Sequence, residues 1–113
     1  MGDRISISFK KGDEESVALF SHWGGIAFYY SAVGYAVNLV RSEKNDAYVS
    51  DPINRLEPHT VMVDFIRHIT KGMKKVRSDV YLGKDSSDGD NSDNGHRVID
   101  LDTVEKEAIL RKL

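Results

Sequence analysis

The sequence predicts an α+β fold in which a four-stranded antiparallel sheet carries two helices on one face. One stretch near the N-terminus alternates apolar and polar residues and a second has an extended apolar pattern. A long apolar stretch of helical length follows, and two more strand-like stretches lie near the C-terminus. Runs of strands and runs of helices, without strict alternation, are typical of α+β proteins. A chain of 113 residues predicts one domain, 1–113, with the element order ββααββ.

The first two predicted strands form a hairpin. Ile5, Ile7 and Phe9 alternate with polar residues, which is the pattern of a half-buried strand. A polar turn containing Gly12 follows, and an extended apolar pattern resumes over 16–21. Two short strands across a glycine-containing turn predict a β-hairpin.

Two helices are expected next, over 25–42 and from Pro58 onward. The first contains a nearly continuous apolar run over 26–40, whose length favours a helix over a strand. Small residues within this run, among them Gly34, would let another element approach closely. The second helix begins with Pro58 in its first turn, where the missing N–H costs nothing, and its apolar residues recur on one face as far as Met73.

The last third of the chain predicts two strands, 76–82 and 96–102, separated by a loop. These strands pair antiparallel if the loop is a hairpin connection. The loop, 83–95, is acidic and has no apolar residue, so we expect it to be flexible. The tail from Thr103 predicts a short C-terminal helix, since Asp102 and Glu105 have the spacing of a capping box.

Composition narrows the classes of function. The chain has no cysteine, which excludes disulfides, thiolate catalysis and cysteine-based metal sites and fits a reducing compartment. The N-terminus has no apolar segment of the secretory type, and the apolar run over 26–40 is too short to span a bilayer. We therefore expect a cytoplasmic protein without a membrane segment and without a cofactor.

Nucleic-acid binding is not favoured by the charge pattern. The net charge is −2, so the molecule as a whole does not attract polyanions. Basic residues do gather at the end of the second helix, but no aromatic residues interleave with them, and cations there also complement the helix dipole. They are Arg67, His68, Lys71, Lys74, Lys75 and Arg77.

The junction of the first hairpin and the first helix, Ser21 to Gly25, is the first candidate site. His22 could act there as a general base, with Asp3 as the acid beside it, while Trp23 and Arg4 could bind a ligand. A structural role is favoured instead: Trp23 closes one end of the core, His22 bonds to the backbone, and the two glycines make the turn.

The acidic loop is a second candidate, for a divalent cation. Asp90, Ser92, Asn94 and Gly95 match the first half of an EF-hand loop. The twelfth position, where a bidentate glutamate is needed, is Leu101, and the flanking segments are predicted strands. Only weak divalent binding through Asp90 and Asn94 is expected.

The first helix also suggests a homodimer. Its aromatic residues surround small ones, and only one face of a helix lying on a sheet is fully buried. The remaining aromatics, among Phe28, Tyr29, Tyr30 and Tyr35, could pack against the second helix or against helix 26–40 of another copy.

Three segments taken together resemble a group of small phage and prokaryotic proteins that have no assigned biochemical activity. They are the opening Met1-Gly2-Asp3-Arg4, the tetrapeptide His22-Trp23-Gly24-Gly25, and the Asp/Asn-rich loop that runs into Val98-Ile99-Asp100-Leu101-Asp102. The resemblance implies the same element order and transfers no catalytic residues. We expect a non-enzymatic binding or interaction module that self-associates; the alternative is a small hydrolase or nuclease-like enzyme that uses His22 with a nearby acid.

Overall fold

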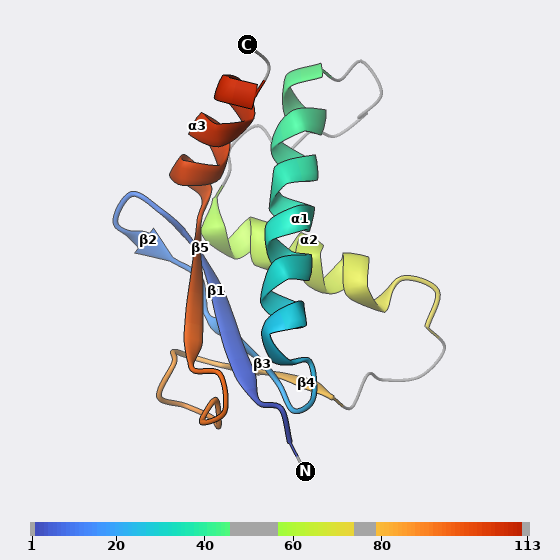
Figure 1. Ribbon diagram of the computed structural model, residues 1–113, viewed down its shortest axis with the longest axis vertical. Coiled ribbons are helices and arrows are strands. Elements are labelled where there is room, and N and C mark those ends of the chain that lie inside the picture. Colours follow the sequence, from blue (N-terminus) through green and yellow to red (C-terminus); the bar gives the residue numbers. More distant parts are fainter. Residues whose placement is uncertain (1, 46–56, 74–78, 112–113) are drawn as a thin grey trace.

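The computed structural model describes residues 2–45, 57–73 and 79–111, which form three helices and a five-stranded sheet (Figure 1). The predicted α+β class is confirmed. The elements are β1 (Ile5–Lys11), β2 (Glu14–Glu15), β3 (Ala18–Ser21), α1 (Gly25–Asn45), α2 (Pro58–Thr70), β4 (Val80–Gly83), β5 (His96–Asp100) and α3 (Leu101–Arg111).

Strand β1 lies in the middle of the sheet. Its residue Ser6 pairs with Phe20 of β3 on one side and with His96 of β5 on the other. The β3 pairing is antiparallel, as expected for the hairpin, and the two-residue strand β2 continues along the same edge of β1. Strand β4 then pairs antiparallel with β3.

The hairpin expected between the last two strands is wrong. Strand β4 pairs with β3, whereas β5 pairs with β1 in the parallel sense, so β4 and β5 lie at opposite edges of the sheet. The sheet also has one strand more than the four predicted, the short β2. The acidic loop can join these distant edges because it crosses one face of the sheet, where its Asn91 bonds to Ser6 of β1.

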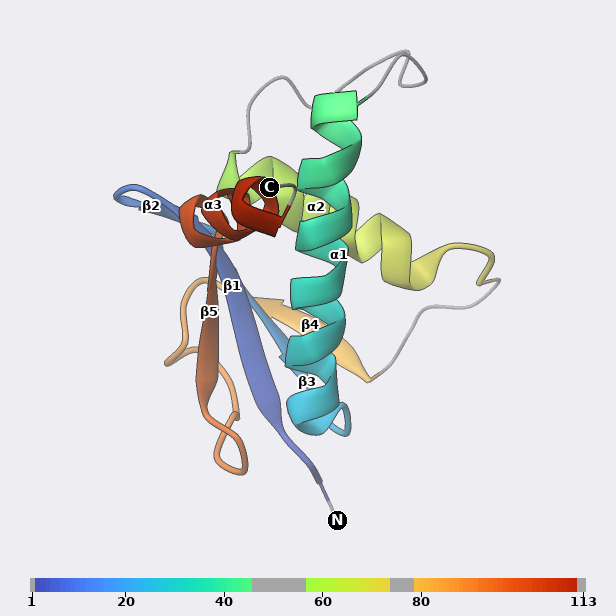
Figure 2. The same cartoon turned by 45° about the horizontal axis from the view of Figure 1, so that its top comes forward.

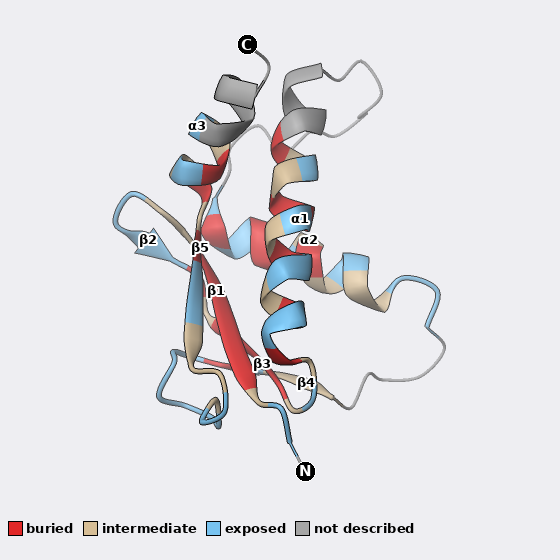
Figure 3. Cartoon of the chain, in the orientation of Figure 1, coloured by how far each residue is buried: buried red, intermediate tan, exposed pale blue. Residues whose placement is uncertain are grey.

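The core lies on the other face of the sheet, where all three helices pack (Figure 2). The alternation in β1 sends Ile5, Ile7 and Phe9 to this face, and none of them keeps any exposed surface. Figure 3 shows β1 buried along most of its length. Phe65 of α2 contacts Phe9 edge-on, with 5.7 Å between the ring centres. The helical part of this cluster is Phe28, Ala32, Tyr35, Ala36, Val40, Val61, Met62, Phe65, Leu101 and Val104.

Several element boundaries differ from the sequence prediction. Helix α1 continues to Asn45, and α2 ends at Thr70, just before Gly72 with its φ of +80°. Helix α3 begins directly after β5, because the Asp100 carboxylate accepts a hydrogen bond from the Asp102 amide at 3.0 Å and so caps the helix. Of the predicted strand 76–82, residues 76–78 lie outside the described part of the chain.

Candidate functional site

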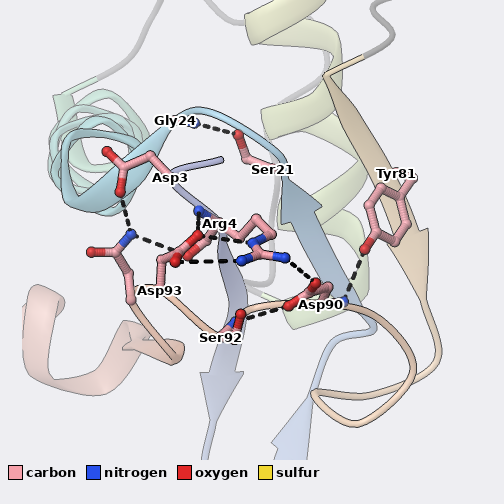
Figure 4. Close-up of polar contacts among 9 residues, drawn as sticks. Asp3, Arg4, Ser21, Gly24, Tyr81, Asp90, Ser92 and Asp93 are labelled. Carbon is pink, nitrogen blue, oxygen red and sulfur yellow. Dashed lines mark hydrogen bonds and ion pairs between the residues drawn. The ribbon is translucent and has the colours of Figure 1, made fainter. Parts of the chain in front are cut away.

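The junction between β3 and α1 is held together by backbone hydrogen bonds to the N-terminal segment. The Asp3 amide donates to the His22 carbonyl, and the Asp3 carbonyl accepts from the Gly25 amide, both at 2.9 Å. The Ser21 hydroxyl accepts from the Gly24 amide, also at 2.9 Å (Figure 4). The segment 21–25, the first candidate site, is thus a tightly hydrogen-bonded corner next to the start of β1.

His22 and Asp3 are neighbours along this corner, but their side chains have different partners. The His22 ring contacts two aromatic rings, and its centre lies 5.5 Å from that of Trp23 and 5.1 Å from that of Tyr81. The Asp3 carboxylate accepts a hydrogen bond from the Asn94 side-chain amide at 2.7 Å. Within the described part of the chain the His22 ring has no hydrogen bond to a carboxylate, so the proposed acid–base pair stays a prediction.

A shallow open depression of about 430 Å³ lies at this corner, lined by Gly2, Arg4, His22 and Trp23. It brings together three of the residues that the sequence suggested for a site. Trp23 is 60% exposed, so it does not close the end of the core, which was the structural role expected for it.

Arg4 does not project freely into this depression, because two loop aspartates hold its guanidinium. Its Nε donates to Asp93 at 2.8 Å and an Nη donates to Asp90 at 2.5 Å, while its amide also bonds to Asp93 (Figure 4). The hydrogen bond from Arg4 lowers the pKa of Asp93, and hydrogen bonds from Ser92, followed by the charge of Arg4, lower the pKa of Asp90. The cation that this acidic loop binds in the folded chain is therefore an arginine side chain.

The two residues that the sequence suggests for a divalent cation also bond to other residues of the chain. Asp90 pairs with Arg4, and the Asn94 amide donates to Asp3 and to the Arg4 carbonyl. Among the described residues, no three His, Cys, Asp or Glu side chains come close enough to hold a metal ion. Leu101, at the twelfth EF-hand position, is buried. Weak divalent binding by the loop stays a prediction without support from this geometry.

The acidic loop packs against the outer face of the sheet instead of projecting into solvent. The Asp90 amide donates to the Tyr81 hydroxyl at 3.0 Å. A Cβ on Gly89 would lie 2.7 Å from that hydroxyl and 2.8 Å from the Phe20 ring, so only glycine fits this approach. Hydrogen bonds and glycine contacts thus fix a loop that has no apolar side chain to bury.

A hydrogen-bonded chain of polar side chains lies beneath this loop and was not predicted. Ser6 bonds to Nδ1 of His96 at 2.7 Å, and Ser8 bonds to Nε2 at 3.0 Å and donates to Glu15 at 2.7 Å. Asn91 donates to the Ser6 hydroxyl at 2.8 Å. The feature of the sequence that points to this cluster is the alternation of Ser6 and Ser8 with the apolar residues of β1.

This cluster resembles the serine, histidine and acid of a hydrolase in composition only. Both serines have no exposed surface, so no substrate can reach either hydroxyl while the loop is in place. Each of these side chains is hydrogen-bonded to at least one other member of the cluster. It therefore ties the loop to β1 and β2.

The outer face of α1, which points away from the sheet, is the other notable surface. On this face Tyr30 is 65% exposed and Ile26 37% exposed. The sequence from Trp23 to Val40 contains no charged residue. The remaining exposed positions of this outer face are small or neutral: Ala27, Ser31, Gly34 and Asn38.

The basic residues at the end of α2 divide into two groups. Arg67 donates to Asp64 at 3.0 Å, and the His68 ring packs against Tyr35 with 5.2 Å between ring centres. Both therefore take part in contacts within the chain. Lys74, Lys75 and Arg77 lie outside the described residues.

In the part of the chain that the structure describes, none of the helices combines the length and the apolar character that a membrane span needs. Comparison with known proteins gave no match to any family model, to any curated protein or to any solved structure.

Proposed function

We propose that this protein is a non-enzymatic interaction module that associates with itself through the outer face of α1. A single observation carries the proposal: large apolar side chains are exposed on a helix that has no charged residue over four turns. Ile26 and Tyr30 are the largest of these side chains. Exposed apolar surface of this kind, where it is contiguous, marks sites of protein association.

The charge pattern supports a partner of the same chemistry. A face without charge offers nothing to a nucleic acid or to an anionic membrane surface. Two such faces can bury each other without leaving an unpaired charge, which would be costly. A second copy of the chain carries the same uncharged face, so no other kind of partner is needed.

A hydrolase or nuclease-like activity of His22 has less support. The Asp3 carboxylate bonds to Asn94, and the His22 ring contacts Trp23 and Tyr81. The lack of cysteine favours a reducing compartment, so we place the module in the cytoplasm. We also propose that it is related to small phage and prokaryotic proteins, and the support is the resemblance of the opening tetrapeptide, of 22–25 and of the Asp/Asn-rich loop.

Size-exclusion chromatography with light scattering tests the proposal. The mass of the wild-type protein should rise from one chain toward two with increasing concentration. Tyr30→Glu should remain a single chain throughout, because the charge would be buried unpaired, and its dissociation constant should increase at least about tenfold.

Val63→Glu is the matched control. Val63 is an exposed apolar residue of α2, 68% exposed, and lies outside the outer face of α1. This variant should dimerise like the wild type. A wild-type protein that stays a single chain at the highest soluble concentration would contradict the proposal.

A further inference from the structure

We infer that the depression at the corner between β3 and α1 binds a small organic cation of the quaternary ammonium class against the Trp23 ring. The inference goes beyond the proposed self-association, which uses the outer face of α1, and does not depend on it. Two features of the corner carry it: an exposed tryptophan that other aromatic rings hold in place, and an excess of negative charge around the depression.

Trp23 is the exposed member of a connected set of four aromatic rings. Phe20 and Tyr81 stack with their ring centres 5.0 Å apart, and the His22 ring lies 5.1 Å from that of Tyr81. The Trp23 ring lies 5.5 Å from His22 and is 60% exposed, whereas Phe20 is fully buried. These contacts hold the indole ring in place at the edge of the depression and leave much of it accessible to a ligand.

An accessible indole ring attracts cations. Tryptophan is the aromatic side chain that binds a cation best, when the cation lies within about 6 Å of the ring centre. A quaternary ammonium group suits such a ring because its methyl groups contact the ring face while its charge interacts with the ring quadrupole. The depression, of about 430 Å³, also has the volume of a small-molecule site, roughly 300–1,000 Å³.

The charges around the depression leave a negative balance. Asp93 offsets the charge of Arg4, whose Nε donates to it at 2.8 Å (Figure 4). The Asp3 carboxylate lies so close to Gly25 that a Cβ there would collide with it, and it therefore offsets the positive end of the α1 dipole. The charge of Asp90, whose side chain is 50% exposed, remains, because Arg4 supplies one positive charge to two carboxylates. This balance favours a cation at the corner.

The same contacts disfavour a metal ion and an anion. A hard metal ion needs several oxygen ligands, but oxygens of Asp90 and Asp93 already accept hydrogen bonds from Arg4. An anion would compete with these carboxylates for Arg4 and would be repelled by them. A quaternary ammonium group needs neither a ligand oxygen nor a hydrogen bond, so it can bind while Arg4 keeps both partners.

Tryptophan fluorescence tests the site directly, because Trp23 is the only tryptophan of the chain. Choline should change its emission with a dissociation constant of about 1 mM, since a cation–π contact at an open site is weak. The uncharged alcohol in which carbon replaces the nitrogen of choline should bind at least about fivefold more weakly. Phosphocholine should also bind more weakly than choline, because its phosphate would meet the excess carboxylate charge.

Variants of Trp23 separate the ring from its apolar area. Trp23→Leu should weaken choline binding at least about fivefold, whereas Trp23→Phe keeps a ring and should retain part of the affinity. Neither variant has a tryptophan, so binding is followed through the methyl proton resonance of choline, which a neighbouring ring shifts upfield. Val63→Ala, at an exposed apolar residue of α2, is the matched control and should bind like the wild type. Circular dichroism establishes that each variant is folded.

The results that would overturn the inference differ from one another. Equal binding of choline and its uncharged analogue would show an apolar site, and tighter binding of phosphocholine would show an anion site at Arg4. Unchanged affinity in Trp23→Leu would place the cation away from the ring. No binding at about 100 mM choline, where a millimolar ligand saturates its site, would exclude the site altogether. Light scattering measures self-association separately, so each of these results leaves the proposed function standing.

Discussion

Gly12 and Gly25 have almost the same backbone conformation but very different surroundings. Their φ angles are +59° and +60°, in the left-handed region that favours glycine. A Cβ on Gly12 would meet nothing within 4 Å, whereas one on Gly25 would collide with the Asp3 carboxylate. Substitution of Gly12 therefore measures the cost of backbone strain alone. Substitution of Gly25 adds the cost of the close approach to Asp3 at the corner between β3 and α1.

Gly25→Ala should therefore destabilise the protein more than Gly12→Ala does. The control variant carries only the left-handed strain, about 1 kcal/mol, and Gly25→Ala adds displacement of Asp3, for a total of about 3 kcal/mol. Urea unfolding followed by circular dichroism gives both values. Equal losses in the two variants would show that Asp3 moves aside without cost.

The Tyr35–Asp64 contact joins α1 to α2 at the level of single side chains. The Tyr35 hydroxyl donates to the Asp64 carboxylate, and Arg67 donates to the same group at 3.0 Å. Partial burial alone would raise the pKa of Asp64, but the hydrogen bonds from Tyr35 and Arg67 outweigh it and lower that pKa. Burial and this hydrogen bond also raise the pKa of Tyr35.

Tyr35→Phe should lower the free energy of unfolding by about 1 kcal/mol at neutral pH, because it removes one partly buried charge-assisted hydrogen bond. A carboxylate with a lowered pKa stabilises the fold above its unfolded value, near 4, and this contribution is lost as the pH falls through the folded pKa. The difference in stability between the variant and the wild type should therefore begin to shrink as the pH falls below about 4 and disappear as it falls through the lower folded pKa. A difference that is constant from neutral to acid pH would argue against this contact.

At the scale of elements, the sequence predicts which side of a strand or helix is buried better than it predicts which strands pair. The alternation in β1 identified Ile5, Ile7 and Phe9 as the buried side, and the apolar length of 26–40 identified α1, because both patterns follow from the geometry of a single element. Which strands pair is decided by contacts distant in the chain. The parallel pairing of β5 with β1 left no signal in the periodicity of either strand.

The acidic loop is held in place by contacts that its composition does not predict. Flexibility was expected because residues 83–95 contain no apolar side chain. Instead, Arg4 and Ser6 supply polar partners from β1, and Gly89 approaches the Phe20 ring closely. The corner at His22 and the loop at Asp90 were each identified from the sequence, whereas their connection through Arg4 was not, because it joins residues almost ninety positions apart.

Arg4→Ala should loosen this loop without unfolding the core. The amides of Asn94 and Gly95, which bond to the Arg4 and Asn91 carbonyls, should exchange with solvent at least about tenfold faster by hydrogen exchange. Lys71→Ala, an exposed change at the far end of α2, is the control and should leave them unchanged.

Acid should have the same effect in the wild type. Because the pKa of Asp93 is lowered by Arg4, the ion pair persists through pH 4 and is lost as the pH falls further. Unchanged exchange in Arg4→Ala would mean that the serine and histidine hydrogen bonds beneath the loop are sufficient to hold it.

At the scale of the whole molecule, the two faces of the sheet are covered by different means. Helices cover one face through apolar packing, and the acidic loop covers the other through hydrogen bonds. The outer face of α1, with Tyr30 and Ile26 exposed, is a surface without charged side chains that no described element covers. The proposed self-association would bury this face against a second chain, so it predicts that association and folding stability are coupled.

This coupling predicts that the melting temperature rises with protein concentration. Above the dissociation constant, a tenfold increase in concentration should raise it by about 2–4 °C, because only the folded chain dimerises. The shift should persist between roughly 0.1 and 1 M salt, although the Debye length falls from about 10 to 3 Å, since the interface has no charged side chain. Tyr30→Glu should abolish the concentration dependence, and Val63→Glu should retain it. Calorimetry over a series of protein and salt concentrations gives both dependences of the melting temperature. If the wild-type shift disappears with salt, the interface lies on charged residues outside the outer face of α1.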